Sequence, residues 1–266
     1  MIADAHCHPY YLKKVFADCE VQRQSLNIIC AASAWNKDDW AYIQKISNNE
    51  EIKTGCRKMI LCFAVHPQMC ALYPKSDVDA SLYLLHQLLS ENSLDAIGES
   101  GFDFFNTDLK NTEELQSAIF EEHLDLAIKY KLPLVLHIRR SMQKIFSYKA
   151  KLKRVPSIVF HSFSGTLDEA QFFLRSGINA YFSFGTAIML NHKAAIKCCS
   201  HLDSDRILFE TDAPYQMLKG EMYSSYCDIK KVIQSASVLR GSSVAELEKI
   251  SCSNFFNAFG MHRKFR

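Results

Sequence analysis

The sequence has few glycines and prolines and no long apolar segment. Nine glycines and six prolines occur in 266 residues, and neither a low-complexity linker nor a repeat of fixed period is present. This predicts one domain over residues 1–266. No apolar run reaches about 18 residues, and the chain does not open with the regions of a secretion signal. We therefore expect a soluble, cytoplasmic protein with no membrane partner.

The ten cysteines lack the regular spacing of a disulfide framework. No C-x-x-C occurs, Cys198 and Cys199 are adjacent, and Cys30 and Cys62 lie in apolar runs. This pattern is typical of buried free thiols in a reducing compartment.

The chain also lacks a strong excess of one charge. Its formal net charge is +2, with both signs mixed along the sequence. This argues against a protein dedicated to coating a polyanion but leaves room for a local basic site. No G-x-G-x-x-G follows the first apolar run, which disfavours nucleotide binding of the Rossmann type.

Eight short apolar runs alternate with amphipathic stretches. Most runs are continuously apolar, as expected of strands buried on both faces. The predicted strands are 1–6, 27–32, 59–65, 94–99, 132–137, 157–161, 179–184 and 206–210, and the clearest helices are 77–91, 112–131 and 167–176. This alternation predicts an α/β fold, a (β/α)8 TIM barrel, with an open doubly wound sheet as the alternative.

Two histidines stand at the end of the first predicted strand. A regular strand would place Asp4, His6 and His8 on one face and Ala5 and Cys7 on the other. Paired imidazoles at a strand end are good ligands for a divalent metal ion and poor core residues. The alternative is a loop in which the two histidines share no role.

Polar residues also follow other predicted strands. They are His66, Glu99, His137, His161 and Asp212, after the third, fourth, fifth, sixth and eighth runs. In a (β/α)8 barrel the carboxyl ends of the strands meet at one mouth, where active sites are built. Burying these groups without a metal would leave several of them unsatisfied, at a cost of about a few kcal/mol each.

We predict that this mouth binds two divalent ions, magnesium, manganese or zinc, bridged by Glu99. The predicted ligands of one ion are His6, His8, Glu99 and Asp212, and those of the other are Glu99, His137 and His161. Asp212 is placed to accept a proton from a water molecule or to orient it. Asp212 and Glu99 are therefore the predicted catalytic residues.

Three further residues are candidate substrate contacts. Arg139 is either a phosphate contact or a solvated side chain, and Ser162 follows a predicted ligand. His66 is a candidate substrate contact, and its alternatives are a turn residue, an indirect partner of the metal site or a direct ligand. Glu210 is expected to contact an arginine or to support a ligand. The other histidines in helical stretches, predicted as surface or core residues, are His86, His123, His192 and His201.

Six motifs resemble, in order, those of the TatD-like metal-dependent deoxyribonucleases, part of a wider superfamily of metal-dependent hydrolases. They are DAHCH at 4–8, AVHP at 64–67, IGESGFD at 97–103, PLVLHIR at 133–139, FHSFSG at 160–165 and ETDAPY at 210–215. The resemblance covers nearly the whole chain. It implies a TIM barrel and hydrolysis of phosphodiester bonds in DNA. It also implies divalent metals bound by six ligands, namely His6, His8, Glu99, His137, His161 and Asp212.

The sequence departs from the family pattern at Ser100, Ile138 and Arg140. These departures leave the predicted metal ligands in place but leave the substrate preference open.

Three functions remain in competition. The first is a DNase acting on single strands or strand ends, with DNA as its partner and no obligate protein partner evident. The second is an amidohydrolase or deacylase that cleaves C–N or ester bonds on the same barrel, and the third is a scaffold without catalysis. Glu99 and Arg139 favour a phosphate substrate, whereas a carbamylated lysine at the fourth strand would favour the second function.

Overall fold

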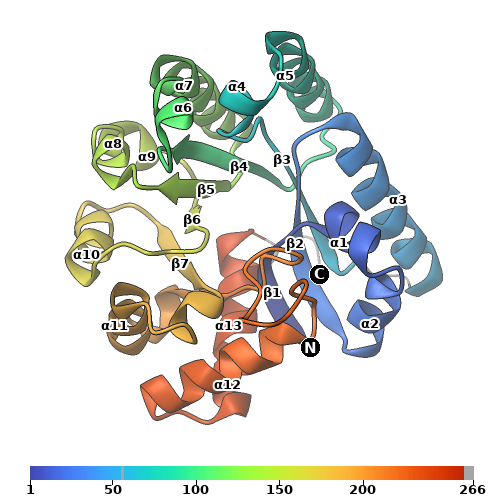
Figure 1. Ribbon diagram of the computed structural model, residues 1–266, viewed down its shortest axis with the longest axis vertical. Coiled ribbons are helices and arrows are strands. Elements are labelled where there is room, and N and C mark those ends of the chain that lie inside the picture. Colours follow the sequence, from blue (N-terminus) through green and yellow to red (C-terminus); the bar gives the residue numbers. More distant parts are fainter. Residues whose placement is uncertain (55–56, 261–266) are drawn as a thin grey trace.

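The computed structural model describes residues 1–54 and 57–260, and in these residues eight parallel strands form one sheet. The strands follow one another in sequence order from β1 to β8, each parallel to its neighbour (Figure 1). They are β1 (Ile2–Cys7), β2 (Ile28–Ala34), β3 (Met59–Phe63), β4 (Ala96–Asp103), β5 (Leu134–Arg139), β6 (Ile158–Phe160), β7 (Ala180–Phe184) and β8 (Ile207–Phe209). The predicted α/β class and (β/α)8 barrel are confirmed.

Helices connect the strands and surround the sheet. The longer ones are α3 (Lys37–Thr54), α5 (Lys75–Ser90), α7 (Glu113–Tyr130), α10 (Leu167–Arg175), α11 (Lys193–His201), α12 (Asp228–Arg240) and α13 (Val244–Ala258). The shorter ones are α1 (Pro9–Val15), α2 (Cys19–Ser25), α4 (Met69–Leu72), α6 (Thr107–Lys110), α8 (Met142–Phe146), α9 (Lys149–Leu152) and the 3-10 turns η1 (Thr186–Ile188) and η2 (Ser204–Arg206).

Hydrogen bonds between β1 and the segment after β8 bring the two edges of the sheet together. The backbone N–H of Asp212 donates to the His6 carbonyl at 2.9 Å, and the N–H of His8 donates to the Ala213 carbonyl at 2.8 Å. The buried Asp4 carboxylate accepts from the Thr211 N–H at 3.0 Å and from its hydroxyl at 2.7 Å. The first strand and the segment after the last are therefore held side by side.

Register shifts in two strands, β1 and β4, change which side chains face the mouth of the barrel. The pairing of β1 with β2 shifts between Asp4 and Cys7. Ala5 packs in the inner core with Phe255 of α13, whereas Cys7 packs in the outer core under the helices. The expectation that Ala5 and Cys7 share a face is therefore wrong, because an irregularity in the strand resets its alternation.

The fourth strand is longer than predicted. It continues past Glu99 to Asp103, because residues beyond the expected end still pair with β5, as Gly101 does with His137. Its register shifts between Ile97 and Ser100, on either side of Glu99. A shift of this kind re-aims a side chain, and here it spans Glu99, whose carboxylate faces the mouth.

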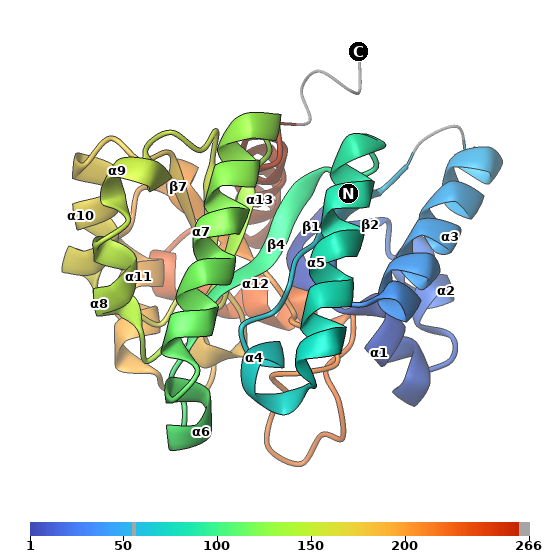
Figure 2. The same cartoon turned by 90° about the horizontal axis from the view of Figure 1, so that it is seen from above.

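The short helices mark the end of the barrel that carries the site. Figure 2 shows α1, α4, α6 and the loop between β8 and α12 at the same end, opposite the last turn of α13. Among residues 1–54 and 57–260, no helix has the length and apolar character needed to cross a membrane. All nine cysteines in these two ranges are free thiols, in line with the predicted absence of a disulfide framework.

Candidate metal centre and substrate cavity

Six side chains from five strand ends converge at the mouth of the barrel. They are His6 and His8 at β1, Glu99 in β4, His137 in β5, His161 directly after β6 and Asp212 after β8. All are buried except His137, which is partly exposed. These are the six residues that the sequence predicted as metal ligands, and the fold brings all of them together.

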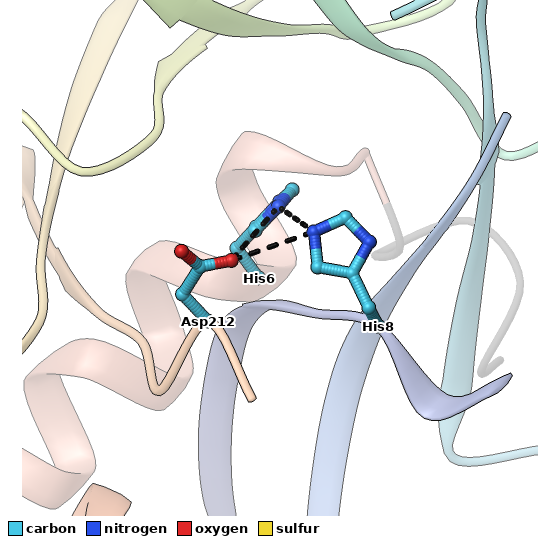
Figure 3. Close-up of side chains that lie close together, drawn as sticks. All are labelled: His6, His8 and Asp212. Atoms are coloured by element: carbon cyan, nitrogen blue, oxygen red, sulfur yellow. Dashed lines mark hydrogen bonds and ion pairs between the residues drawn. The ribbon is translucent and has the colours of Figure 1, made fainter. Parts of the chain in front are cut away.

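The first group surrounds one oxygen of Glu99. Glu99 Oε2 is 3.3 Å from His6 Nε2 and 3.5 Å from His8 Nε2. Asp212 Oδ1 is 3.7 Å and 3.4 Å from the same two nitrogens, which are themselves 3.2 Å apart. Figure 3 shows both imidazoles and the Asp212 carboxylate pointing toward one another. This group contains the four predicted ligands of the first ion.

The second group surrounds the other oxygen of Glu99. Glu99 Oε1 is 2.7 Å from His137 Nδ1, 3.2 Å from His161 Nε2 and 3.5 Å from His66 Nε2. His66, predicted as a substrate contact, therefore lies as near to Glu99 as His8 does. The carboxylate stands between two sets of imidazoles, which is the position that a bridging ligand requires.

The donor atoms fit divalent cations. A tetrahedral site with metal–ligand bonds of about 2.0–2.2 Å places its donors roughly 3.3–3.6 Å apart. The donor separations in the first group, from 3.2 Å to 3.7 Å, match this spacing. Neutral imidazoles mixed with carboxylates suit zinc or manganese, whereas magnesium prefers a fuller set of oxygen ligands.

Charged partners hold the outer nitrogens of two histidines. Asp103 Oδ2 is 3.1 Å from His137 Nε2 and accepts a bond from Gln68 Nε2 at 2.7 Å. Glu210 Oε1 is 3.0 Å from His161 Nδ1. Glu210 was expected either to contact an arginine or to support a ligand, and it contacts the predicted ligand His161. Carboxylates in this position fix the ring orientation and raise the basicity of a ligating imidazole.

The electrostatics of the centre favour ionised carboxylates. Burial lowers the pKa of His161, but Glu210 and Glu99 outweigh it and raise the value to about 10. Burial also opposes protonation of His137, yet Asp103 and Glu99 raise its pKa to about 9. Burial raises the pKa of Glu99, but the surrounding histidines hold it well below its usual range. A cation entering here would replace protons on the imidazoles, so its binding would release protons.

A glutamine that the sequence analysis did not single out joins the site across the mouth. Gln216 Nε2 donates to Asp212 Oδ2 at 2.9 Å and to Ser162 Oγ at 2.8 Å. Gln216, Asp212 and Ser162 have φ angles of 53°, 52° and 46°, in the left-handed region that non-glycine residues seldom adopt. Such strained residues gather at functional sites when the surrounding structure fixes them.

A cavity of about 740 Å³ opens above the metal-binding groups. His8, Glu99 and Asp212 line its floor, and its walls include all three predicted substrate contacts. Those contacts are Arg139, His66 and Ser162. Aromatic side chains form one wall, namely Tyr11, Trp35, Tyr73 and Tyr215. The volume is in the range of roughly 300–1,000 Å³ typical of pockets for small ligands.

The Phe105 ring packs against two arginines at the rim of the cavity. The guanidinium carbon of Arg139 lies 3.7 Å from the centroid of the Phe105 ring, and that of Arg140 lies 4.8 Å away. Arg140 Nη1 also donates to the Phe105 carbonyl at 2.7 Å. The Arg139 side chain is exposed, and within residues 1–54 and 57–260 no carboxylate forms an ion pair with it, so it can meet a phosphate.

Two of the remaining histidines differ in their surroundings. His123 is fully buried and contacts Ser100 Oγ through Nδ1 at 2.6 Å, so it is a core residue as expected. His192, at the start of α11, was expected to lie away from the site, but it lines the cavity. Its position in a helical stretch gave no signal, because the turn before α11 carries it to the mouth.

The barrel and its centre define a class of protein, the metal-dependent hydrolases built on a (β/α)8 fold. The family model described as TatD related DNase matches residues 3–260, and the chain belongs to this family. The suspected relationship is thus confirmed over nearly the whole length.

Named relatives agree with this assignment. An "Uncharacterized metal-dependent hydrolase" of Buchnera aphidicola is 27% identical over 80% of this chain and 78% of its own. The "3'-5' ssDNA/RNA exonuclease TatD" of Pectobacterium carotovorum is 27% identical over 68% of this chain and 72% of its own. The crystal structure of the TatD homologue YjjV from Escherichia coli superimposes with a TM-score of 0.80 at 25% identity, covering 97% of this chain and 98% of that one.

Proposed function

We propose that this chain, acting as one domain over residues 1–266, hydrolyses phosphodiester bonds of DNA at the ends of single strands. The single observation that carries the proposal is the division of the Glu99 carboxylate between two groups of imidazoles. The name of the Pectobacterium relative, an exonuclease for single-stranded DNA and RNA, supports the same substrate class. The free cysteines fit action in a reducing compartment such as the cytoplasm.

We propose two divalent cations as cofactors, zinc or manganese before magnesium. His6, His8, Glu99 and Asp212 would hold one, and Glu99, His137 and His161 would hold the other, with His66 near enough to join them. When bound, such cations polarise the phosphodiester and lower the pKa of water.

The residues of the chain supply the rest of the mechanism. Asp212, with Oδ2 held by Gln216, is oriented to accept the proton of the attacking water. Ser162 Oγ accepts from Gln216, so its hydroxyl proton is available to a phosphate oxygen. Arg139 offers a planar fork of donors to the same phosphate. The hydroxyl of Ser162 and the guanidinium of Arg139 together hold the scissile bond above Glu99.

The test is hydrolysis by protein loaded separately with zinc, manganese or magnesium. Substrates are an end-labelled single-stranded DNA, its duplex, the matching RNA, and an aryl ester and amide. We expect stepwise shortening of single-stranded DNA, and loss of at least 100-fold in kcat for Asp212→Asn. His201→Asn, at an exposed position in α11, is the matched control. Metal content and a thermal melt of each variant separate lost catalysis from lost folding.

No cleavage of any DNA by metal-loaded wild type would refute the proposal. Cleavage of the ester or amide alone would instead favour the second function considered from the sequence.

A further inference from the structure

A second cavity lies beside the metal centre, and nothing in the proposed mechanism uses it. It has a volume of about 560 Å³ and is lined by α1, the start of α3 and α5. It shares four lining residues with the first cavity, which are Tyr11, Trp35, Met69 and Tyr73. The two cavities are therefore neighbours with these side chains between them, and a ligand seated over Glu99 reaches the second one by passing over this boundary.

Aromatic rings form the boundary between the two cavities. The Tyr11 and Trp35 rings are parallel to within 4°, with centroids 5.9 Å apart. Tyr73 lies 5.0 Å from Trp35 and is 40% exposed. Beyond them, Tyr83 on α5 lines the second cavity and is 74% exposed. Exposed rings that line a groove, as Tyr73 and Tyr83 do here, are a feature on which bases of single-stranded nucleic acids stack.

The charges of the second cavity are balanced. Lys14 Nζ lies 4.1 Å from the Tyr10 ring centroid and 4.8 Å from that of Tyr11, so two rings hold the ammonium beside the groove. Lys37 also lines the cavity, but two carboxylates, Asp38 and Asp77, line it as well. Stacking, with one phosphate contact from Lys14, is therefore the chemistry that this surface offers, and dense phosphate binding is excluded.

We propose that the second cavity is a subsite for a nucleotide of the substrate strand that is not itself cleaved. The base stacks on the rings around Tyr83, and Lys14 contacts the adjoining phosphate. This inference rests on the proposed nuclease function and adds to it a preference for single strands long enough to reach past Trp35. A base inside a duplex is stacked on both faces and held by its partner, so a duplex would have to unpair before such a base could stack on Tyr83.

The experiment compares a short and a long substrate. Wild type, Tyr83→Ala, Lys14→Ala and the double variant are assayed on bis(p-nitrophenyl) phosphate and on a single-stranded DNA octamer. We expect kcat/KM on the octamer to fall about 5- to 50-fold in Tyr83→Ala and less in Lys14→Ala, mainly through KM. Hydrolysis of the small ester should stay within twofold of wild type. Lys230→Ala, exposed on α12, is the matched charge control.

A direct readout uses octamers with 2-aminopurine at successive positions. Wild type should quench the fluorescence of 2-aminopurine at a single position, which lies beyond the cleaved nucleotide. In Tyr83→Ala the fluorescence at that position should be restored. Equal loss on both substrates, or no loss on either, would overturn the subsite while DNA cleavage by wild type left the nuclease function intact. A change of oligomeric state in the variants, measured by light scattering, would instead make this face a contact between copies and would also overturn it. Failure of wild type to cleave DNA would remove both proposals.

Discussion

At the scale of single residues, the two oxygens of Glu99 face different partners. Oε2 lies near His6 and His8, and Oε1 lies near His137 and His161. The bridging position was inferred from the place of the fourth strand between the two histidine groups, and the geometry supports it. The sequence did not indicate the roles of Asp103 and Gln216. Asp103 contacts His137 on the neighbouring strand, and Gln216 reaches Asp212 across a turn in which both residues have positive φ.

His123 lends itself to a test of stability against pH. The Val65 N–H donates to His123 Nε2 at 3.4 Å, so the proton of the neutral ring is assigned to Nδ1, facing Ser100. Burial, with His86 nearby, lowers the pKa of His123 to about 3. The unfolded chain therefore binds a proton first as pH falls below about 6.5, and native stability is lost progressively toward the folded value.

We expect the stability advantage of wild type over His123→Gln to shrink by about 2 kcal/mol between pH 6.5 and pH 5. Urea unfolding at several pH values measures this difference. His201→Gln, at an exposed position, should run parallel to wild type. Parallel curves for His123→Gln as well would contradict the assignment of a neutral, buried ring.

Arg139 and Arg140 form a matched pair for testing phosphate contact. Both lie by the Phe105 ring, but only Arg139 lines the cavity. Arg139→Gln should raise KM for single-stranded DNA about 5- to 30-fold and reduce the slope of log(kcat/KM) against log[salt] by about 0.7, as for one phosphate contact. Arg140→Gln should leave both within error. Steady-state kinetics at about 50 to 300 mM salt measures both quantities. Equal effects of Arg139→Gln and Arg140→Gln would argue against a specific phosphate contact by Arg139.

At the scale of elements, irregular strands aim the site. β1 and β4 both shift register next to a predicted ligand, and strict alternation along the sequence could not show this. The shifts depend on pairing with β2 and β5, so they arise only when the sheet forms. The strands and their order could be predicted because continuous apolar runs are a local property of the chain.

The opposite end of the barrel depends on a buried arginine. Arg23 of α2 donates to the carbonyls of Ile28 and Lys58, at the starts of β2 and β3, at 3.0 Å and 3.2 Å. Its Nη2 is 3.1 Å from Glu50 of α3, and both side chains are buried. Removing Arg23 takes away the ion pair with Glu50 and the donors to both carbonyls, and breaking such a buried pair typically costs about 3–5 kcal/mol.

Arg23→Ala should therefore lower the free energy of unfolding by about 3–5 kcal/mol, with initial rates at 15 °C near those of wild type. Chemical denaturation and an activity assay measure the two effects. Arg175→Ala on α10, an exposed residue bonded to Gln171, should change stability by less than about 0.5 kcal/mol. A large loss of activity in folded Arg23→Ala would show that this end of the barrel also serves the site.

At the scale of the whole molecule, the candidate metal centre joins distant parts of the chain. Its donors come from β1, β4, β5, β6 and the segment after β8. A cation held by these groups binds only the folded state, so it adds about 2.7 kcal/mol of stability at 100 times its dissociation constant.

Exhaustive chelation should lower Tm by about 5–10 °C for a chain of this size, and stoichiometric zinc or manganese should restore it. Scanning calorimetry with elemental analysis makes the measurement, and titration in a weakly buffered solution should show proton release on metal uptake. His8→Asn should reduce the shift, whereas His86→Asn, at an exposed position, should not. An unchanged Tm with no metal retained would count against a cation site.

The sequence by itself determined the order of strands and helices, and which strand ends carry imidazoles and carboxylates. Both follow from local patterns: apolar runs become strands, and a polar residue after such a run lies at its carboxyl end. Only the tertiary structure decided which oxygen of Glu99 faces which histidine, that Gln216 holds Asp212, and that a second cavity borders the first. Glu99 meets histidines of separate strands, and Gln216 also bonds Ser162, which is 54 residues away in the sequence. Such contacts exist only once the strands have assembled into the barrel.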